Sequence, residues 1–122
     1  MITDLAPDEI FVFGSNASGQ HGAGAARTAL ERFGAVWGQG SGLQGQSYGI
    51  DTMSGFEKIR AEVATFLAFA GEHPELRFLV TKVGCGIAGY VPAEIAPLFA
   101  GSPTNVVLPA EFASLLAPPA LD

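Results

Sequence analysis

Short apolar runs alternate along the chain with segments whose apolar residues recur at helical spacing. The run at residues 10–13 is continuously apolar and rich in β-forming side chains, and the Gly-Ser-Asn sequence at 14–16 closes it. Uninterrupted runs of this length are typical of strands buried on both faces of a sheet. The predicted strands are 10–13, 35–37, 47–50, 77–83 and 105–108.

Helical spacing is clearest in the middle of the chain. Ser54 and Glu57 have the spacing of a capping box, which predicts a helix start, and Gly71 and Pro74 predict its end. Between them the apolar residues form one stripe, made of Phe56, Ile59, Val63, Phe66, Leu67 and Ala70.

Three further segments favour helix. Residues 24–33 have a narrow, alanine-lined face suited to close packing on a sheet. In residues 92–99, Pro92 suits a first helical turn and Pro97 predicts an irregular last turn. Residues 111–116 predict a short terminal helix.

Strands and helices therefore alternate, with no internal repeat and no linker. This order predicts one domain over residues 1–122, a three-layer α/β/α sandwich around a mostly parallel mixed sheet. Such sheets bind ligands at the carboxyl ends of their strands. Ten of the 16 glycines lie between Gly14 and Gly49 and three more between Gly84 and Gly89, so the predicted loops at that edge are rich in glycine. Residues 38–46 are predicted to form one such loop.

The composition narrows the classes of function. The 122 residues are 48% hydrophobic and 15% charged, which argues against disorder, and no apolar run approaches the roughly 18 residues of a membrane helix. Twelve acidic residues against six scattered basic ones, a net charge of −6, disfavour binding of duplex nucleic acid through a basic patch. We therefore expect a globular protein that does not associate with membranes.

Few residues suggest metal, cofactor or disulfide chemistry. The single cysteine forms no intrachain disulfide, and residues 1–4 lack the character of a signal peptide, so a cytoplasmic location is expected. Two histidines and one cysteine without paired spacing predict no metal site, and no cofactor is expected.

Three short motifs lack the context that their chemistry requires. G-x-G-x-x-G occurs at 84–89 and again at 40–45, but only 33 residues follow the first match, too few for the remaining units of a dinucleotide-binding fold. G-x-S-x-G at 45–49 lacks the flanking strand and helix of a nucleophile elbow, for which Asp51 and His73 would be the partners. Cys85 is either a thiol nucleophile or a small buried residue, and its loop has no arginine to bind a phosphate.

His21 is the histidine of greater interest. It precedes Gly22-Ala23-Gly24 at a predicted helix start, where free amides and the helix dipole favour an anion. It is either an exposed loop residue or a donor to a ligand phosphate or ribose.

Two segments together resemble a known family. The strand at 10–13 runs into Gly14, Ser15 and Asn16, and a short polar loop then leads to Gly22-Ala23-Gly24 at the start of a helix. Residues 80–89 supply a second strand and glycine loop. This order resembles the macrodomain family, and above all its compact bacterial and phage members, while the Gly-Cys-Gly loop is similar to that of the terminal ADP-ribose glycohydrolase branch.

The resemblance implies a site for ADP-ribose at the carboxyl edge of the sheet. Asn16 would hold the distal ribose, the segment 22–24 would pass close to that ribose and the diphosphate, and residues 84–90 would wrap the diphosphate from the other side. Tyr90 or Phe11 would either stack on a ring of the ligand or belong to the hydrophobic core. The implied ligand-binding residues are Gly14, Ser15, Asn16, His21, Gly22, Ala23, Gly24, Gly84, Cys85, Gly86, Ile87, Ala88, Gly89 and Tyr90.

The chain departs from the family's pattern at three places. Only nine residues precede Ile10, where many macrodomains have further strands and an adenine-binding aspartate, so Asp4 or Asp8 would take that role. Residues 25–27 are Ala-Ala-Arg where the mono-ADP-ribosylhydrolase branch has an acidic residue. The Gly-Cys-Gly branch has an aspartate after its loop and a lysine on a central segment, whereas this chain has Ala88 and Asp51-Thr52.

Three functions are therefore open. The first is binding of ADP-ribose or a related NAD-derived nucleotide. The second is hydrolysis that removes ADP-ribose from a modified protein, a nucleic acid or an ester, in which Asn16 positions the ribose and His21 or Asp51 activates water. The third is an interaction module whose pocket holds no ligand. The expected partners are a small nucleotide and, for the second function, an ADP-ribosylated macromolecule.

Overall fold

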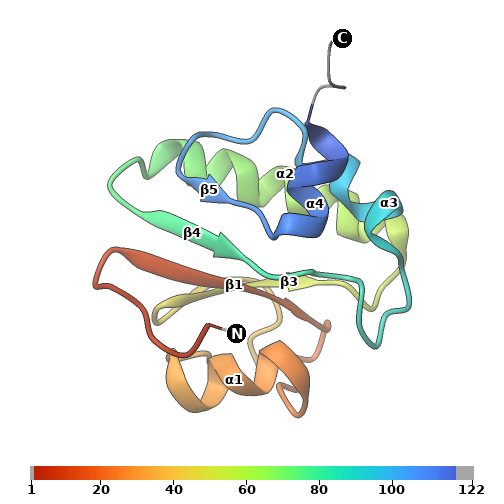
Figure 1. Cartoon of the computed structure of the whole chain (residues 1–122). Coiled ribbons are helices and arrows are strands. Elements are labelled where there is room, and N and C mark those ends of the chain that lie inside the picture. Colours follow the sequence, from red (N-terminus) through yellow and green to blue (C-terminus); the bar gives the residue numbers. More distant parts are fainter. Residues whose placement is uncertain (1, 118–122) are drawn as a thin grey trace, which may run out of the picture.

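A five-stranded mixed sheet forms the centre of the molecule in the computed structural model, which describes residues 2–117 (Figure 1). The strand order is β2-β3-β1-β4-β5. Strands β3, β1, β4 and β5 are parallel, and only β2 at one edge is antiparallel to its neighbour. The bounds are β1 Glu9–Ser15, β2 Gly42–Gln44, β3 Ser47–Asp51, β4 Arg77–Val80 and β5 Val106–Val107.

Helices cover both faces of the sheet, which confirms the predicted three-layer α/β fold. Figure 1 shows α1 on one face and α2, α3 and α4 on the other. The helical segments are α1 Gly24–Arg32, α2 Phe56–Glu72, α3 Pro92–Ile95, the 3-10 turn η1 Ala96–Phe99 and α4 Ala110–Leu116. No helix within residues 2–117 is long and apolar enough to span a bilayer.

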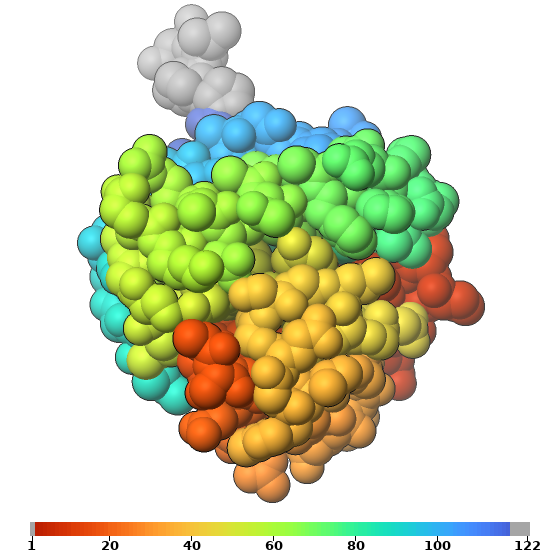
Figure 2. Space-filling view, turned by 180° about the vertical axis from the view of Figure 1, so that it is seen from behind, coloured from red at the N-terminus to blue at the C-terminus, as the bar shows by residue number. Residues whose placement is uncertain are grey.

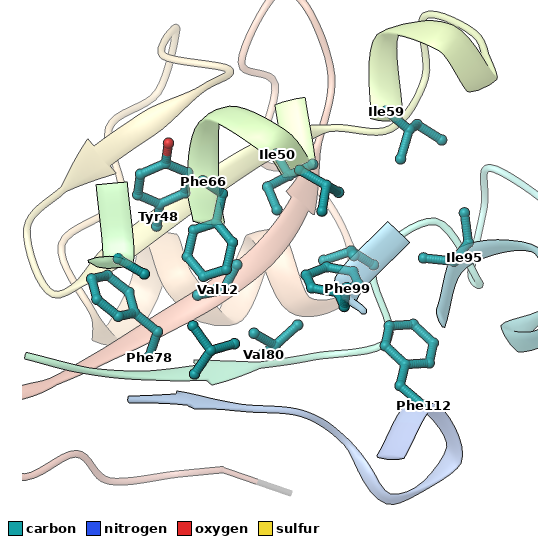
Figure 3. Close-up of a cluster of buried hydrophobic side chains, with 14 of the residues drawn as sticks. Val12, Tyr48, Ile50, Ile59, Phe66, Phe78, Val80, Ile95, Phe99 and Phe112 are labelled. Carbon is teal, nitrogen blue, oxygen red and sulfur yellow. The ribbon is translucent and has the colours of Figure 1, made fainter. Parts of the chain in front are cut away.

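The central strand explains the two cores. Alternate residues of a strand point to opposite faces, so Ile10 and Val12 face α2 while Phe11 and Phe13 face α1. All four side chains are buried, as the uninterrupted apolar run predicts. Figure 3 shows the larger core, where aromatic side chains from the sheet and from the helices of the α2 face meet around Phe66.

Several local predictions are wrong. Residues 35–37 form no strand, and β2 lies inside the predicted loop 38–46. The strand predicted over 77–83 ends at Val80, where the chain turns towards α3.

The predicted capping box is also absent. Gly55, at φ +98°, is the residue before α2, and the Ser54 hydroxyl donates to the Asp51 carboxylate at 2.7 Å instead of capping the helix. Further along the chain, the irregular turn predicted at Pro97 is confirmed as a 3-10 turn.

Candidate functional site

The carboxyl ends of β1, β3 and β4 open onto a groove of about 720 Å³, which also borders the start of α1. In Figure 1 the arrowheads of β1 and β4 point to the same side of the molecule, and the connecting loops gather there. A parallel sheet brings these loops together because the carboxyl ends of its strands share one edge. We call this cavity the edge groove; its lining residues are Gly14, Ser15, Asn16, Gln20, Gly22, Ala23, Gly24, Ala25, Ala26, Trp37, Thr52, Met53, Thr81, Lys82, Val83, Gly84, Cys85, Gly86, Ile87 and Ala88.

Backbone amides on two sides of the edge groove lack acceptors. Within the described residues, the N–H groups at 22–24 and at 86–88 donate no hydrogen bond to the protein. No side chain caps α1, and its first turn contains no acidic residue. Free amides at a helix start carry partial positive charge and bind anions. The edge groove is therefore bordered by two sets of free amides, one at the start of α1 and one in the second glycine loop.

Glycines of the edge groove fall into two kinds. A Cβ at Gly14 would lie 3.2 Å from the Thr52 hydroxyl, and one at Gly84 would lie 3.2 Å from Ile95, so internal packing favours glycine at both positions. A Cβ at Gly22 or Gly86 would meet nothing within 4 Å, and neither residue has a positive φ. At these two positions the protein itself does not require glycine, and the absent side chain leaves space in the groove.

The charge of the edge groove differs from that of the whole chain. Although the protein carries a net charge of −6, the described lining residues include no aspartate or glutamate, and Lys82 is their one charged side chain. Acidic residues therefore lie elsewhere, and an anion in the groove meets no neighbouring carboxylate there.

Asn16 lines the edge groove, but its side chain is committed to its own loop. Its Oδ1 accepts from the Gln20 amide at 2.9 Å and from the Ser18 hydroxyl at 3.1 Å, and its Nδ2 donates to the Gln20 carbonyl at 2.9 Å. These three bonds close the turn between β1 and α1. Asn16 therefore shapes the loop that carries the free amides.

His21 does not line the edge groove, and it is not an exposed loop residue. Its side chain is 1% exposed. The ring lies between the Ser15 hydroxyl, 3.4 Å from Nδ1, and Gln44 Oε1, 3.2 Å from Nε2. Because Oε1 only accepts hydrogen bonds, Nε2 donates to it, while Nδ1 pairs with the Ser15 hydroxyl. Both ring nitrogens are thus used inside the protein.

Asp51 is equally enclosed. It is 1% exposed, and its carboxylate accepts from the Met53 amide at 3.0 Å and from the Ser54 hydroxyl at 2.7 Å. These bonds hold the turn that joins β3 to α2. The structure therefore brings Asn16 to the groove but does not bring His21 or Asp51 to its surface.

The second glycine loop contributes residues 84–88 to the lining, but not Gly89 or Tyr90. The Tyr90 ring packs against Phe56 at a centroid distance of 5.9 Å, and Phe11 is buried against Phe33 at 4.9 Å. Neither ring faces the edge groove, so the expected stacking on Tyr90 or Phe11 has no support in the geometry.

Cys85 lies half-buried on the groove wall. Burial raises the pKa of its thiol, and this effect exceeds the opposing attraction of Lys82. The thiol is therefore protonated at neutral pH, as a structural cysteine would be.

Trp37 and Met53 are lining residues that the sequence analysis did not identify. Their side chains are 58% and 50% exposed. Trp37 lies in the segment 35–37, which the sequence predicts as a strand, whereas the structure places Trp37 in a turn. Its flanking loop glycine, Gly38, is the signal that could have indicated an exposed position.

A second groove, of about 680 Å³, continues from the first on the α1 face of β4 and β5. The two share Ala25, Thr81 and Lys82. This groove exists because α1 covers the β1 side of that face and leaves Leu79 and Val107 partly exposed.

No cluster of three or more His, Cys, Asp or Glu side chains suited to a metal occurs within residues 2–117. Comparisons with models of protein families, with curated proteins and with solved structures give no match. The fold and site together define an α/β domain with a glycine-lined groove at the carboxyl edge of a mostly parallel five-stranded sheet.

Proposed function

We propose that this protein binds ADP-ribose or a related NAD-derived nucleotide in the edge groove. The observation that carries the proposal is the convergence of two sets of free amides, at 22–24 and at 86–88, on a groove whose described lining has no carboxylate. A diphosphate is an anion that backbone amides can hold without a cluster of basic side chains.

The size and the shape of the groove suit a nucleotide. Its volume of about 720 Å³ lies within the roughly 300–1,000 Å³ of typical small-molecule sites. Gly22 and Gly86 leave room for a ligand to approach the backbone closely. The resemblance of both glycine loops to those of macrodomains supports the same assignment, because both loops border this one groove.

Hydrolysis of an ADP-ribosyl bond is not favoured by any observation. Asn16, His21 and Asp51, the residues expected to carry it, already have their polar atoms in hydrogen bonds within the protein. A general base must reach the water that it activates, and His21 and Asp51 are both 1% exposed. Binding is therefore the function proposed.

The test is calorimetric titration with ADP-ribose, NAD, ADP and ribose 5-phosphate. We expect heat with ADP-ribose, and we expect Gly86→Val to abolish it because the branched side chain would occupy the open space next to the free amides. Gly71→Val is the matched control, since Gly71 lies in α2, where an added Cβ has only Pro103 nearby, at 3.8 Å.

Both variants should melt within a few degrees of the wild type, which separates loss of binding from loss of folding. Wild-type affinity in Gly86→Val would contradict the placement of the ligand. The absence of heat with all four compounds would contradict nucleotide binding and favour an interaction module.

A further inference from the structure

Trp37 is the chain's single tryptophan, and its indole is 58% exposed where it borders the edge groove. Its neighbour Val36, 48% exposed, does not line the groove. An exposed indole costs hydrophobic free energy unless something covers it. Several other apolar side chains of the protein are exposed as well, but Trp37 is an aromatic one that borders the groove, and Val36, at the same turn, provides a control for it.

The turn that carries Trp37 is fixed to the first glycine loop by backbone contacts. The Gly38 amide donates to the Gly19 carbonyl at 2.9 Å. A Cβ at Gly19 would lie 2.4 Å from the Gln39 amide nitrogen, and one at Gly40 would lie 2.1 Å from the Asn16 carbonyl oxygen. Figure 2 shows the two segments side by side, the red-orange loop near residue 18 against the amber segment near residue 40.

The buried His21 and Gln44 side chains add a second attachment. Gln44 Oε1 accepts from the Val36 amide at 2.8 Å as well as from His21 Nε2 at 3.2 Å. The Gln44 amide nitrogen donates to the Gln39 carbonyl at 3.2 Å. The His21 ring also stands edge-on to the indole, with centroids 6.5 Å apart. The backbone that carries the indole is thus held before any ligand arrives, which lowers the entropic cost of binding.

We infer that Trp37 is the stacking platform for the nucleobase of the ligand, an inference that rests on the proposed function. The anionic part of the ligand lies between the two sets of amides, and its planar base covers the indole. With no carboxylate in the described lining to read the edge of a base, recognition at this wall comes from stacking. Stacking depends on ring area, so purines are preferred over pyrimidines.

His21 is part of the structure that supports this turn. Its ring is hydrogen-bonded to Gln44, which also accepts from the Val36 amide, and the histidine is buried.

Fluorescence and affinity test the inference together. Because Trp37 is the one tryptophan, a base stacked on it changes the emission of the protein directly. ADP and nicotinamide mononucleotide serve as separate probes, since each carries one of the two rings of NAD. Saturating ADP-ribose should quench the emission, and ADP should quench it as well because adenine is the base of both compounds. Nicotinamide mononucleotide should leave the emission unchanged, and quenching by it but not by ADP would contradict the inference.

Affinity is then measured for Trp37→Ala, Trp37→Phe and the control Val36→Ala. Loss of one stacked base typically weakens binding about tenfold or more, which is expected for Trp37→Ala with ADP-ribose. Trp37→Phe should retain most of the affinity, and Val36→Ala all of it. The preference for ADP over UDP should disappear in Trp37→Ala, an effect that a merely structural role would not produce.

Two outcomes would overturn the inference alone: wild-type affinity in Trp37→Ala, or unchanged emission at saturating ADP-ribose while calorimetry reports binding. If the wild type binds none of these nucleotides, the proposed function fails as well.

Discussion

At the scale of single residues, polar side chains beside the glycine loops form hydrogen bonds that hold the neighbouring turns in place. Asn16 uses both ends of its amide to close a turn, and Asp51 holds the turn before α2. A buried polar group is costly unless it is hydrogen-bonded, so a side chain that folding encloses must find partners inside the protein. These residues therefore position the backbone that forms the groove.

Cys85 has a testable protonation behaviour. Burial disfavours its thiolate and raises the pKa, while the positive charge of Lys82 lowers it by a smaller amount. The rate of alkylation by iodoacetamide at about pH 7.5 should therefore be lower than that of a free thiol, whose pKa is about 8.5. This rate should rise only at higher pH.

Removing the Lys82 charge is a second step of the same experiment. Lys82→Gln should raise the pKa of Cys85 further and displace the alkylation profile towards higher pH, because the one attraction that favours the thiolate is lost. The rate is followed by mass spectrometry across the pH series. A reactive thiolate at neutral pH would refute this account.

At the scale of elements, the alternation of apolar runs was the most reliable signal. Strand β1 and helices α1 and α2 lie within two residues of their predicted bounds. The continuous apolar run of a buried strand and the apolar stripe of a helix both arise from burial in the core, so each marks its element clearly. Strand β2 was missed because its three residues are Gly-Leu-Gln, and antiparallel pairing with β3 makes them a strand. Pairing is a property of two segments and is not visible in one.

Phe66 shows how much α2 contributes to the fold. Its side chain is 0% exposed and its ring lies 5.0 Å from Tyr48, 5.4 Å from Phe78 and 6.4 Å from Phe99. Phe66→Ala should lower the free energy of unfolding by about 3–5 kcal/mol through lost burial and a residual cavity. Urea unfolding measures this value.

The neighbouring Thr65, exposed on the same helix, supplies the control. Thr65→Ala should change the free energy of unfolding by no more than about 0.5 kcal/mol. If Phe66→Ala lowered the free energy of unfolding by as little as Thr65→Ala, the α2 face would be loosely packed.

At the scale of the whole molecule, the acidic character and the proposed anionic ligand are compatible because they act at different ranges. The net charge of −6 repels an anion over a distance comparable to the Debye length, whereas the free amides of the edge groove act at contact. Salt screens the first effect far more than the second.

The affinity for ADP-ribose should therefore stay constant or increase, by up to about threefold, when the salt concentration rises from about 50 to about 300 mM. A site built from lysine and arginine side chains would show the opposite dependence. Calorimetry at the two salt concentrations measures it. A several-fold weakening would show that Lys82 or other cations dominate the binding.

The sequence by itself determined the fold class, the buried central strand, the main helices and the gathering of two glycine loops at one edge. These follow from periodicity and from parallel topology, which are local or general rules. The tertiary structure alone decided which side chains face the groove. The contact of His21 with Gln44, 23 residues away, and that of Gly19 with Gly38 depend on how loops pack. These contacts bury the histidine and place Trp37 at the groove. They join segments that are distant in the sequence, so the pattern of residues within any one segment does not predict them.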